Sequence, residues 1–459
     1  MRLTLGLSAA LLMGASSLAH DGTYGPPSEA EHLYDIAVAP SPARIRADIH
    51  TLADFGTRHT LSETESDTRG IGAARRWIFA EFEEISAECG GCLEVVYVSD
   101  FVEGERRIPE PTEVVNVLAI QRGTMDPNRF VMMSGDIDSR VTDPLDGTSD
   151  SPGANDNASG MAGVLEAARV LTKREYPGSI VYMGLSGEEQ GLFGGKIVAA
   201  HAQAEGWNLV GVLNNDMISN ISGIDGVTDN RTVRVFSEGT RATETPEEAR
   251  RRRFTGGEVD SPSRNLARHI KALAHQYMPE LNVKLIYRLD RFGRGGHHRP
   301  FNEAGIPGVR IMETHEHYDR QHQDLRTENG VEYGDVMEGV DADYAAKLTG
   351  LNAITLAAIA GAPPVPADVE ASGAVEPSAK LEWTRATGRA ARNLAGYRVH
   401  WRDTDAPQWE WSRFVGQTDE WTFENLVIDN YIFGVSAVSE DGYETPVVFP
   451  GAAGRFPGE

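Results

Sequence analysis

Apolar, β-branched runs alternate with amphipathic helical patterns through most of the chain, and this alternation is what most limits its possible folds. Strands are predicted at residues 114–120, 129–134, 179–185, 209–213, 232–236, 283–287 and 308–312, and helices at 45–55, 70–85, 161–173, 262–277 and 344–360. Such alternation predicts an α/β fold with a mostly parallel, mixed sheet sandwiched by helices. The polar stretch 240–257 breaks the pattern and is expected to be a solvated loop.

The pattern changes after residues 361–366, a Pro-rich and Ala-rich stretch that reads as a linker. Short strands without helices are then predicted at residues 380–383, 396–401, 421–423 and 431–438, which is typical of an all-β sandwich. Trp383, Tyr397, Leu426 and Tyr431 give this part, residues 365–459, a resemblance to fibronectin type III modules. Few contacts are expected to cross such a linker.

Residues 1–19 have the pattern of a signal peptide. Arg2 precedes an apolar core at 3–13, and small residues at 17–19 form a cleavage site, so the protein is expected to be secreted or periplasmic. The alternative is an uncleaved N-terminal anchor. Residues 20–44 are predicted to be an extended lead-in, which leaves 45–361 for the α/β domain, and no later segment is apolar enough to span a bilayer.

The two cysteines, Cys89 and Cys92, are separated by two glycines. In the cytosol such a pair would suggest redox or metal chemistry. Behind a signal peptide a structural disulfide is expected instead, with two free thiols as the alternative. The formal charge of −25, from 43 basic and 68 acidic residues, argues against a nucleic-acid partner.

Acidic side chains follow three of the predicted strands. Asp136 follows the run 129–134, Glu188 and Glu189 follow 179–185, and Asp216 follows 209–213. In open α/β sheets, ligands gather at the carboxyl ends of the strands, so these carboxylates are expected to meet. Carboxylates brought together repel each other unless cations neutralise them. Taken alone, Glu188-Glu189 would read as a solvated acidic pair at a helix N-terminus.

Asp156 lies in a loop at residues 151–160 that leads into the next helix. Gly153 and Gly160 are expected to permit unusual backbone angles there, and Ser159 to cap the helix. His322, on a later loop, could add the nitrogen ligand that a zinc site usually has. The sequence therefore predicts a metal site.

The stretches 153–160 and 186–194 resemble the co-catalytic di-zinc aminopeptidases of metallopeptidase family 28, and the resemblance extends over about residues 45–360. It implies a zinc-exopeptidase fold, two zinc ions and a peptide or protein substrate. By this resemblance Asp156 would bridge the ions, Asp216 would hold the first, and Glu189 and His322 the second. Glu188 would be the general base, and the peptide bond after Asp156 would be cis.

The chain departs from this family at two places. Asp136 stands where the family has a histidine, in a motif that includes Asp138, and His297-His298 stands where the family has Asp-His. We predict that Asp136 still binds the first metal through oxygen. That site would be all carboxylate and would favour Mn²⁺ or Mg²⁺ relative to Zn²⁺.

The other three residues of these motifs are expected to surround the ligands. Asp138, His297 and His298 would support the ligands or, for the two histidines, replace one. The alternative is a histidine pair without a metal role.

These inferences predict a secreted zinc exopeptidase, most closely an aminopeptidase. The alternatives are a glutaminyl cyclase-like acyltransferase and a non-catalytic binding protein whose metal site has decayed. The β module is expected to bind a surface or a polymeric substrate and to carry no chemistry.

Overall fold

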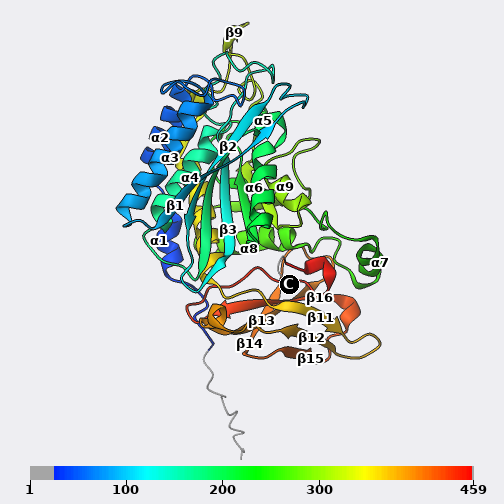
Figure 1. Cartoon of the computed structure of the whole chain (residues 1–459). Coiled ribbons are helices and arrows are strands. Elements are labelled where there is room, and N and C mark those ends of the chain that lie inside the picture. Colours follow the sequence, from blue (N-terminus) through cyan, green and yellow to red (C-terminus); the bar gives the residue numbers. More distant parts are fainter. Residues whose placement is uncertain (1–24, 457–459) are drawn as a thin grey trace, which may run out of the picture.

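The computed structural model describes residues 25–456, so the predicted signal peptide lies outside the described residues. An eight-stranded sheet forms the centre of the larger domain, in the order β1-β2-β4-β3-β5-β8-β6-β7 (Figure 1). Its strands are β1 (Leu93–Val102), β2 (Thr112–Gln121), β3 (Asp126–Asp136), β4 (Gly178–Leu185), β5 (Asn208–Asn215), β6 (Thr232–Phe236), β7 (Asn282–Ile286) and β8 (Gly308–Glu313).

The middle of this sheet is parallel and its edges are mixed. β3 pairs in parallel with β4 and β5, and β5 pairs in parallel with β8, whereas β1, β2 and β6 introduce antiparallel pairs. The mixed, mostly parallel sheet predicted from the sequence is confirmed. Because β3, β4 and β5 run the same way, the residues that follow them meet at one edge of the sheet.

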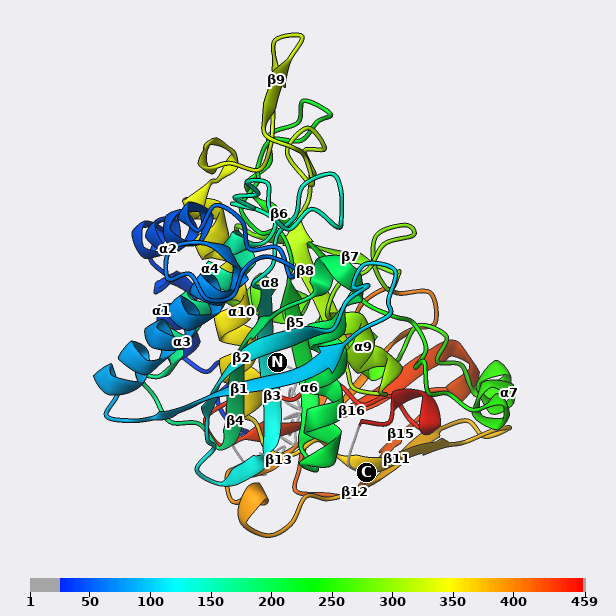
Figure 2. The same ribbon diagram turned by 45° about the horizontal axis from the view of Figure 1, so that its top comes forward.

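Helices cover both faces of the sheet (Figures 1 and 2). They are α1 (His32–Val38), α2 (Pro42–Asp54), α3 (Gly70–Glu88), α4 (Ala158–Leu171), α5 (Glu188–Gly191), α6 (Phe193–Ala204), α7 (Pro246–Thr255), α8 (Pro262–Tyr277), α9 (His298–Glu303) and α10 (Ala342–Gly361). Successive residues of β3 point to opposite faces of the sheet. Val131 and Met133 lie in the core under α2, α4 and α10. Phe130 and Met132 lie in the core under α6 and α9. No helix in residues 25–456 is long and apolar enough to cross a membrane.

Two segments predicted to be irregular are helical. α1 lies in the expected extended lead-in, where Leu33 and Ile36 are buried in the main core. α7 lies in the expected loop 240–257, where Thr245 and Glu248 form a reciprocal capping box. That capping signal is present in the sequence, but α7 buries none of its side chains, so no hydrophobic periodicity marks it.

The C-terminal module contains two three-stranded antiparallel sheets, β11-β12-β15 and β14-β13-β16. Its strands are β11 (Ala367–Ser372), β12 (Ala379–Thr384), β13 (Leu394–Asp403), β14 (Trp411–Gly416), β15 (Glu420–Phe423) and β16 (Tyr431–Ser439). Trp383 and Tyr397 contact each other in the core between the sheets.

The module packs directly against the α/β domain, with α7 beside it (Figure 1). Asp260, just before α8, accepts hydrogen bonds from Arg268 of the same domain and from Arg402 of the module, at 2.7 and 2.9 Å. All three side chains are at most 2% exposed. Tyr443 of the module also joins the main core and contacts His32. The contacts across the boundary are therefore more extensive than a linker implies.

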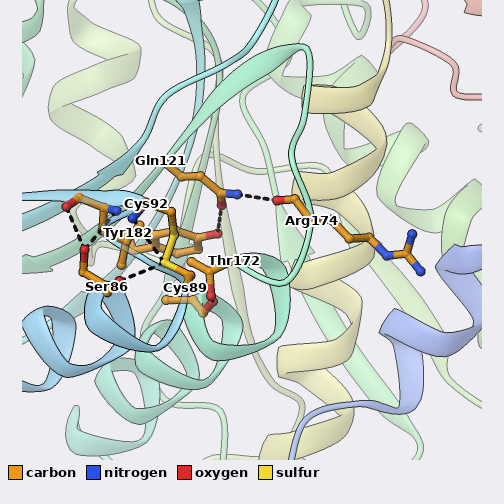
Figure 3. Close-up of a disulfide and its surroundings, with 9 residues drawn as sticks. Ser86, Cys89, Cys92, Gln121, Thr172, Arg174 and Tyr182 are labelled. Carbon is orange, nitrogen blue, oxygen red and sulfur yellow. Dashed lines mark hydrogen bonds between the residues drawn. A yellow bond between two sulfur atoms is a disulfide. The ribbon is translucent and has the colours of Figure 1, made fainter.

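The two cysteines form a disulfide at the end of α3, as expected (Figure 3). It closes the turn into β1 together with Ser86, whose hydroxyl donates to the Leu93 carbonyl and accepts from the Leu93 N–H. The disulfide and the two hydrogen bonds of Ser86 thus fix the small turn that leads into the edge hairpin of β1 and β2.

Two further strands, β9 (Arg326–Glu328) and β10 (Val331–Tyr333), form a hairpin that projects from the main domain at the top of Figure 1. The loop that carries His322 precedes this hairpin.

Candidate metal centre

The loop at residues 151–160 runs along the carboxyl end of β3. Its Asp156–Asn157 peptide bond is cis, as predicted. Asn157, and not Ser159, caps α4: its side-chain oxygen accepts from the Gly160 N–H. Gly153 has φ +51°, but Gly160 is helical, and its role is close packing, because a Cβ there would lie 2.3 Å from the Asn215 carbonyl oxygen.

Two buried charged residues from distant segments hold this loop in place. The Arg58 guanidinium donates to the carbonyl oxygens of Pro152 and Gly153. The Asp335 carboxylate accepts from the backbone N–H groups of Asn155 and Asp156, the latter at 2.6 Å. The position of the Asp156 side chain therefore depends on both residues, and neither lies in a motif that the sequence singled out.

Three of the predicted ligands come together. Ligand atoms of Asp156, Glu189 and His322 all lie within 4.8 Å of one another. Nε2 of His322 is 2.9 Å from Asp156 Oδ2 and 2.9 Å from Glu189 Oε1. One nitrogen and two carboxylate oxygens are a donor set that suits Zn²⁺ and leaves a fourth position open for water or substrate. These residues therefore fit a zinc ion.

An arginine contacts two of these ligands. Arg140 donates to Glu189 Oε2 at 2.7 Å, and its Nη2 lies 2.7 Å from Nδ1 of His322. Burial disfavours a charged ring at His322, but the charges of Glu189 and Asp156 outweigh it and raise the pKa of His322 to about 9. A guanidinium only donates, however, so a doubly protonated ring would place two donors face to face. Nε2 faces the two carboxylates, so it is the ring nitrogen that would bind a cation between them.

Glu188 lies beside the three ligands and lines the same cleft, which has a volume of about 420 Å³. Burial and then the charge of Glu189 raise the pKa of Glu188 well above its ordinary value. Asp138 holds the start of α5 by accepting from the N–H groups of both Glu188 and Glu189, at 3.2 and 3.0 Å. Asp138 thus positions this acidic pair and supports the ligands through the backbone.

Asp136 is bound on both oxygens by neighbouring side chains. Its Oδ1 is 2.6 Å from Nδ1 of His297, and its Oδ2 accepts from Asn157 Nδ2 at 2.6 Å. His297 is fully buried, and its Nε2 has no hydrogen-bond partner within residues 25–456. Thus His297 contacts Asp136 itself, one of the predicted ligands.

Asp216 is paired with a buried arginine. Its Oδ2 lies 2.8 Å from Arg310, which also contacts Asp290 at 3.3 Å. Burial raises the pKa of Asp216 to about 7, against the opposing effect of Arg310. Among residues 25–456, Asp136, Asp156 and Asp216 do not form a second group with ligand atoms this close together. Asp216 Oδ1 is buried and has no hydrogen-bond partner in the described part of the chain.

His298 points away from this cluster. Its Nε2 is hydrogen-bonded to the Leu289 carbonyl oxygen at 2.8 Å, and the ring is fully buried. His298 therefore stabilises the loop before α9. For this residue the structure agrees with the alternative given above, a histidine without a metal role.

Three non-glycine residues next to the site adopt left-handed backbone angles. Leu192, Met217 and His322 have φ of 64°, 64° and 57°. Such conformations cost energy and are retained where surrounding contacts over-determine them, which is frequent at functional sites. Met217 directly follows Asp216, and His322 is itself a predicted metal ligand.

Sequence reasoning missed four charged residues that organise the site: Arg58, Arg140, Arg310 and Asp335. Only Arg310 left a signal, because it stands inside an apolar run predicted to be a buried strand, and a buried arginine needs a partner. The partners of the other three depend on loops whose positions no local pattern reports.

The chain is similar in sequence and in fold to several known proteins. The profile of Peptidase family M28 matches residues 116–338. A probable zinc metalloprotease of Leptosphaeria maculans is 42% identical over 433 residues, covering 94% of this chain and 98% of that protein. The crystal structure of LapA from Legionella pneumophila has a similar fold, with a TM-score of 0.52 and 19% identity over 73% of this chain and 77% of that one. Another structure of that protein, titled an aminopeptidase, has a TM-score of 0.50 and 18% identity over 72% and 75%. From the match to the fungal zinc metalloprotease over nearly its whole length, the chain belongs to peptidase family M28.

Proposed function

We propose that this protein is a zinc-dependent exopeptidase that removes residues from the N-termini of peptides, with Glu188 as its general base. The observation that carries the proposal is the convergence of Asp156, Glu189 and His322 in the same cleft as Glu188. A binding protein with a decayed site has no need of a buried carboxylate beside an intact ligand set.

Each residue has a distinct role in this reaction. Asp156, Glu189 and His322 would hold a zinc ion, which when bound polarises a carbonyl group and makes water more acidic. Glu188 accepts the proton of the attacking water and passes it to the leaving amine. Burial suits Glu188 to this role, because a carboxylate with a raised pKa is a stronger base. Asp138 keeps Glu188 in place through the two backbone hydrogen bonds described above.

Two series of substrates test this proposal. Aminoacyl anilides and N-terminal glutaminyl peptides should be offered to the zinc-loaded protein, with zinc content measured by mass spectrometry. We expect hydrolysis of the anilides. Cyclisation of the glutaminyl peptides would favour the acyltransferase, and a metal-free, inactive protein would favour the binding module.

A second ion remains part of the proposal, held by Asp136, Asp156 and Asp216. Arg310 and His297 already pair with two of these carboxylates, so we expect the second ion to be bound more weakly than the first. After dialysis against a mild chelator, about one equivalent of zinc should remain, the number that a three-residue ligand set holds.

The substitution Asp136→His tests whether the aspartate at this position weakens binding of the second ion. The substitution supplies a nitrogen ligand, and we expect it to raise the retained zinc above that of the unchanged protein, measured by mass spectrometry. A retained zinc content that falls would mean that Asp136 is adapted to its partners, and our assignment of a weakened site would be wrong. Asp100→His makes the same change at an exposed position of β1, away from the site, and as the control it should leave zinc content unchanged.

We also propose that the protein is secreted or periplasmic and that the C-terminal module is of the fibronectin type III class. The Cys89–Cys92 disulfide supports an oxidising compartment. Two three-stranded sheets that enclose Trp383 and Tyr397 support the module assignment. Its role would be to bind a surface or a polymeric substrate.

A further inference from the structure

The cleft that holds the three ligands is lined by cations, although the chain as a whole carries a formal charge of −25. Six basic residues contribute to its wall: Arg107, Arg140, Lys196, Arg291, Arg294 and Arg299. Among the described residues, the acidic ones in the wall are the carboxylates at the metal site and Glu303. The lining thus holds six cations against five carboxylates, and four of those carboxylates lie at the predicted metal site. The cations that have no carboxylate partner of their own are therefore the ones left to attract an anionic occupant.

Three of these cations already have carboxylate partners. Arg140 is bound to Glu189, Arg291 lies 3.0 Å from Glu316, and Arg299 lies 3.2 Å from Glu303. Their charges are therefore largely neutralised within the protein.

The other three cations lack a carboxylate of their own. In the part of the chain that the structure describes, Arg107 and Lys196 have no acidic group within 4.0 Å, and Lys196 lies over the Phe193 ring at 4.4 Å. Arg294 is 3.5 Å from Glu316, a carboxylate that already binds Arg234 and Arg291 more closely. The Arg294 side chain is 33% exposed and can reach a ligand.

From this arrangement we infer that the cleft selects substrates with a carboxylate close to the scissile bond. The inference rests on the proposed peptidase function and specifies its substrate class. The carboxylate has two chemical sources: the side chain of an acidic residue at the N-terminus, or the free C-terminus of a very short peptide. Guanidinium groups bind either one through paired, charge-assisted hydrogen bonds.

Matched substrates separate the two sources. Glutamyl and glutaminyl anilides have nearly the same shape and differ in one charge, and dipeptides with a free C-terminus differ in the same way from their C-terminal amides. We expect kcat/KM to be higher by about tenfold to a hundredfold for the charged member of one pair, the effect of one charge-assisted hydrogen bond. The substrate pair in which the charged member is preferred identifies the source of the carboxylate.

Substitutions in the cleft test whether its cations cause the preference. Arg294→Gln and Lys196→Met should each lower the charged-to-neutral ratio of kcat/KM, and Arg294→Glu should bring it below that of Arg294→Gln. Arg122→Gln is the matched control, because Arg122 pairs with Glu94 at 2.8 Å outside the cleft, and should leave the ratio unchanged. Equal kcat/KM within both substrate pairs, or a ratio that survives all the cleft substitutions, would overturn the inference.

A binding measurement keeps the inference distinct from the proposed catalysis. Zinc-loaded Glu188→Gln protein is titrated calorimetrically with hexapeptides that begin with Glu or Gln, and with dipeptides and their amides. Tighter binding of the charged members would support the inference even if no substrate were turned over. Equal binding within both pairs would refute it, whatever the activity.

Discussion

Glu188→Gln is expected to lower kcat by at least about a hundredfold, the usual contribution of a general base, while zinc content stays the same. Glutamine has nearly the shape of glutamate but cannot accept the proton of the attacking water at neutral pH. Glu188 is not one of the three clustered ligands, so its replacement leaves Asp156, Glu189 and His322 unchanged. The measurements are steady-state turnover of an aminoacyl anilide and zinc by mass spectrometry.

Two comparisons make this result specific. Glu189→Ala should lose zinc as well as activity, because it removes one of the two carboxylates that contact His322 Nε2. Glu303→Gln makes the same change at another carboxylate of the cleft and should retain most of the turnover. If Glu188→Gln hydrolysed the substrate at the unchanged protein's rate, our role for Glu188 would be wrong.

Asp260→Ala is expected to destabilise the protein by about 3–5 kcal/mol, the usual effect of removing one partner of a buried ion pair. Asp260 is the shared carboxylate between Arg268 of α8 and Arg402 of β13. Its removal would leave two buried guanidinium groups without an opposite charge. The effect is measured by urea unfolding or, if unfolding is irreversible, as a lower temperature of thermal unfolding at a fixed heating rate.

The control is Asp67→Ala, at a carboxylate that is 93% exposed and lies 3.4 Å from Arg76. An exposed pair of this kind contributes about 0–1 kcal/mol, so little change is expected. An Asp260→Ala protein as stable as the control would show that the module does not depend on this contact. For the same reason, removal of residues 365–459 should destabilise the α/β domain, contrary to what the linker alone suggests.

Local patterns predicted most of the secondary structure correctly because they record burial over short distances. The helix at residues 262–277 and the strand at 232–236 have the predicted bounds, and both have regular buried positions. α7 was missed because it has no buried face, and α1 because it is short and is stabilised by packing against α10. The hairpin β9–β10 is too short and too exposed to produce an alternating pattern.

The sequence by itself determined the α/β class, most strands and helices of the central sheet and its covering layers, and the acidic and histidine residues from which the zinc-type cluster is drawn. It could do so because each of these depends on neighbouring residues: hydrophobic period, capping and turn chemistry, and acidic groups placed directly after strands. The assignment of Asp156, Glu189 and His322 as ligands came from the resemblance to family 28, which also named Asp216.

Only the tertiary structure decided which buried charges pair with one another. Asp136 meets His297 across 161 positions of sequence, Arg310 binds the Asp216 carbonyl group across 94, and Arg402 reaches Asp260 across 142. A buried charge is stable only beside a partner, but many partners would satisfy that requirement equally well. The fold selects among them, and in doing so it determines how strongly a second ion is held and which cations of the cleft are left without a carboxylate partner.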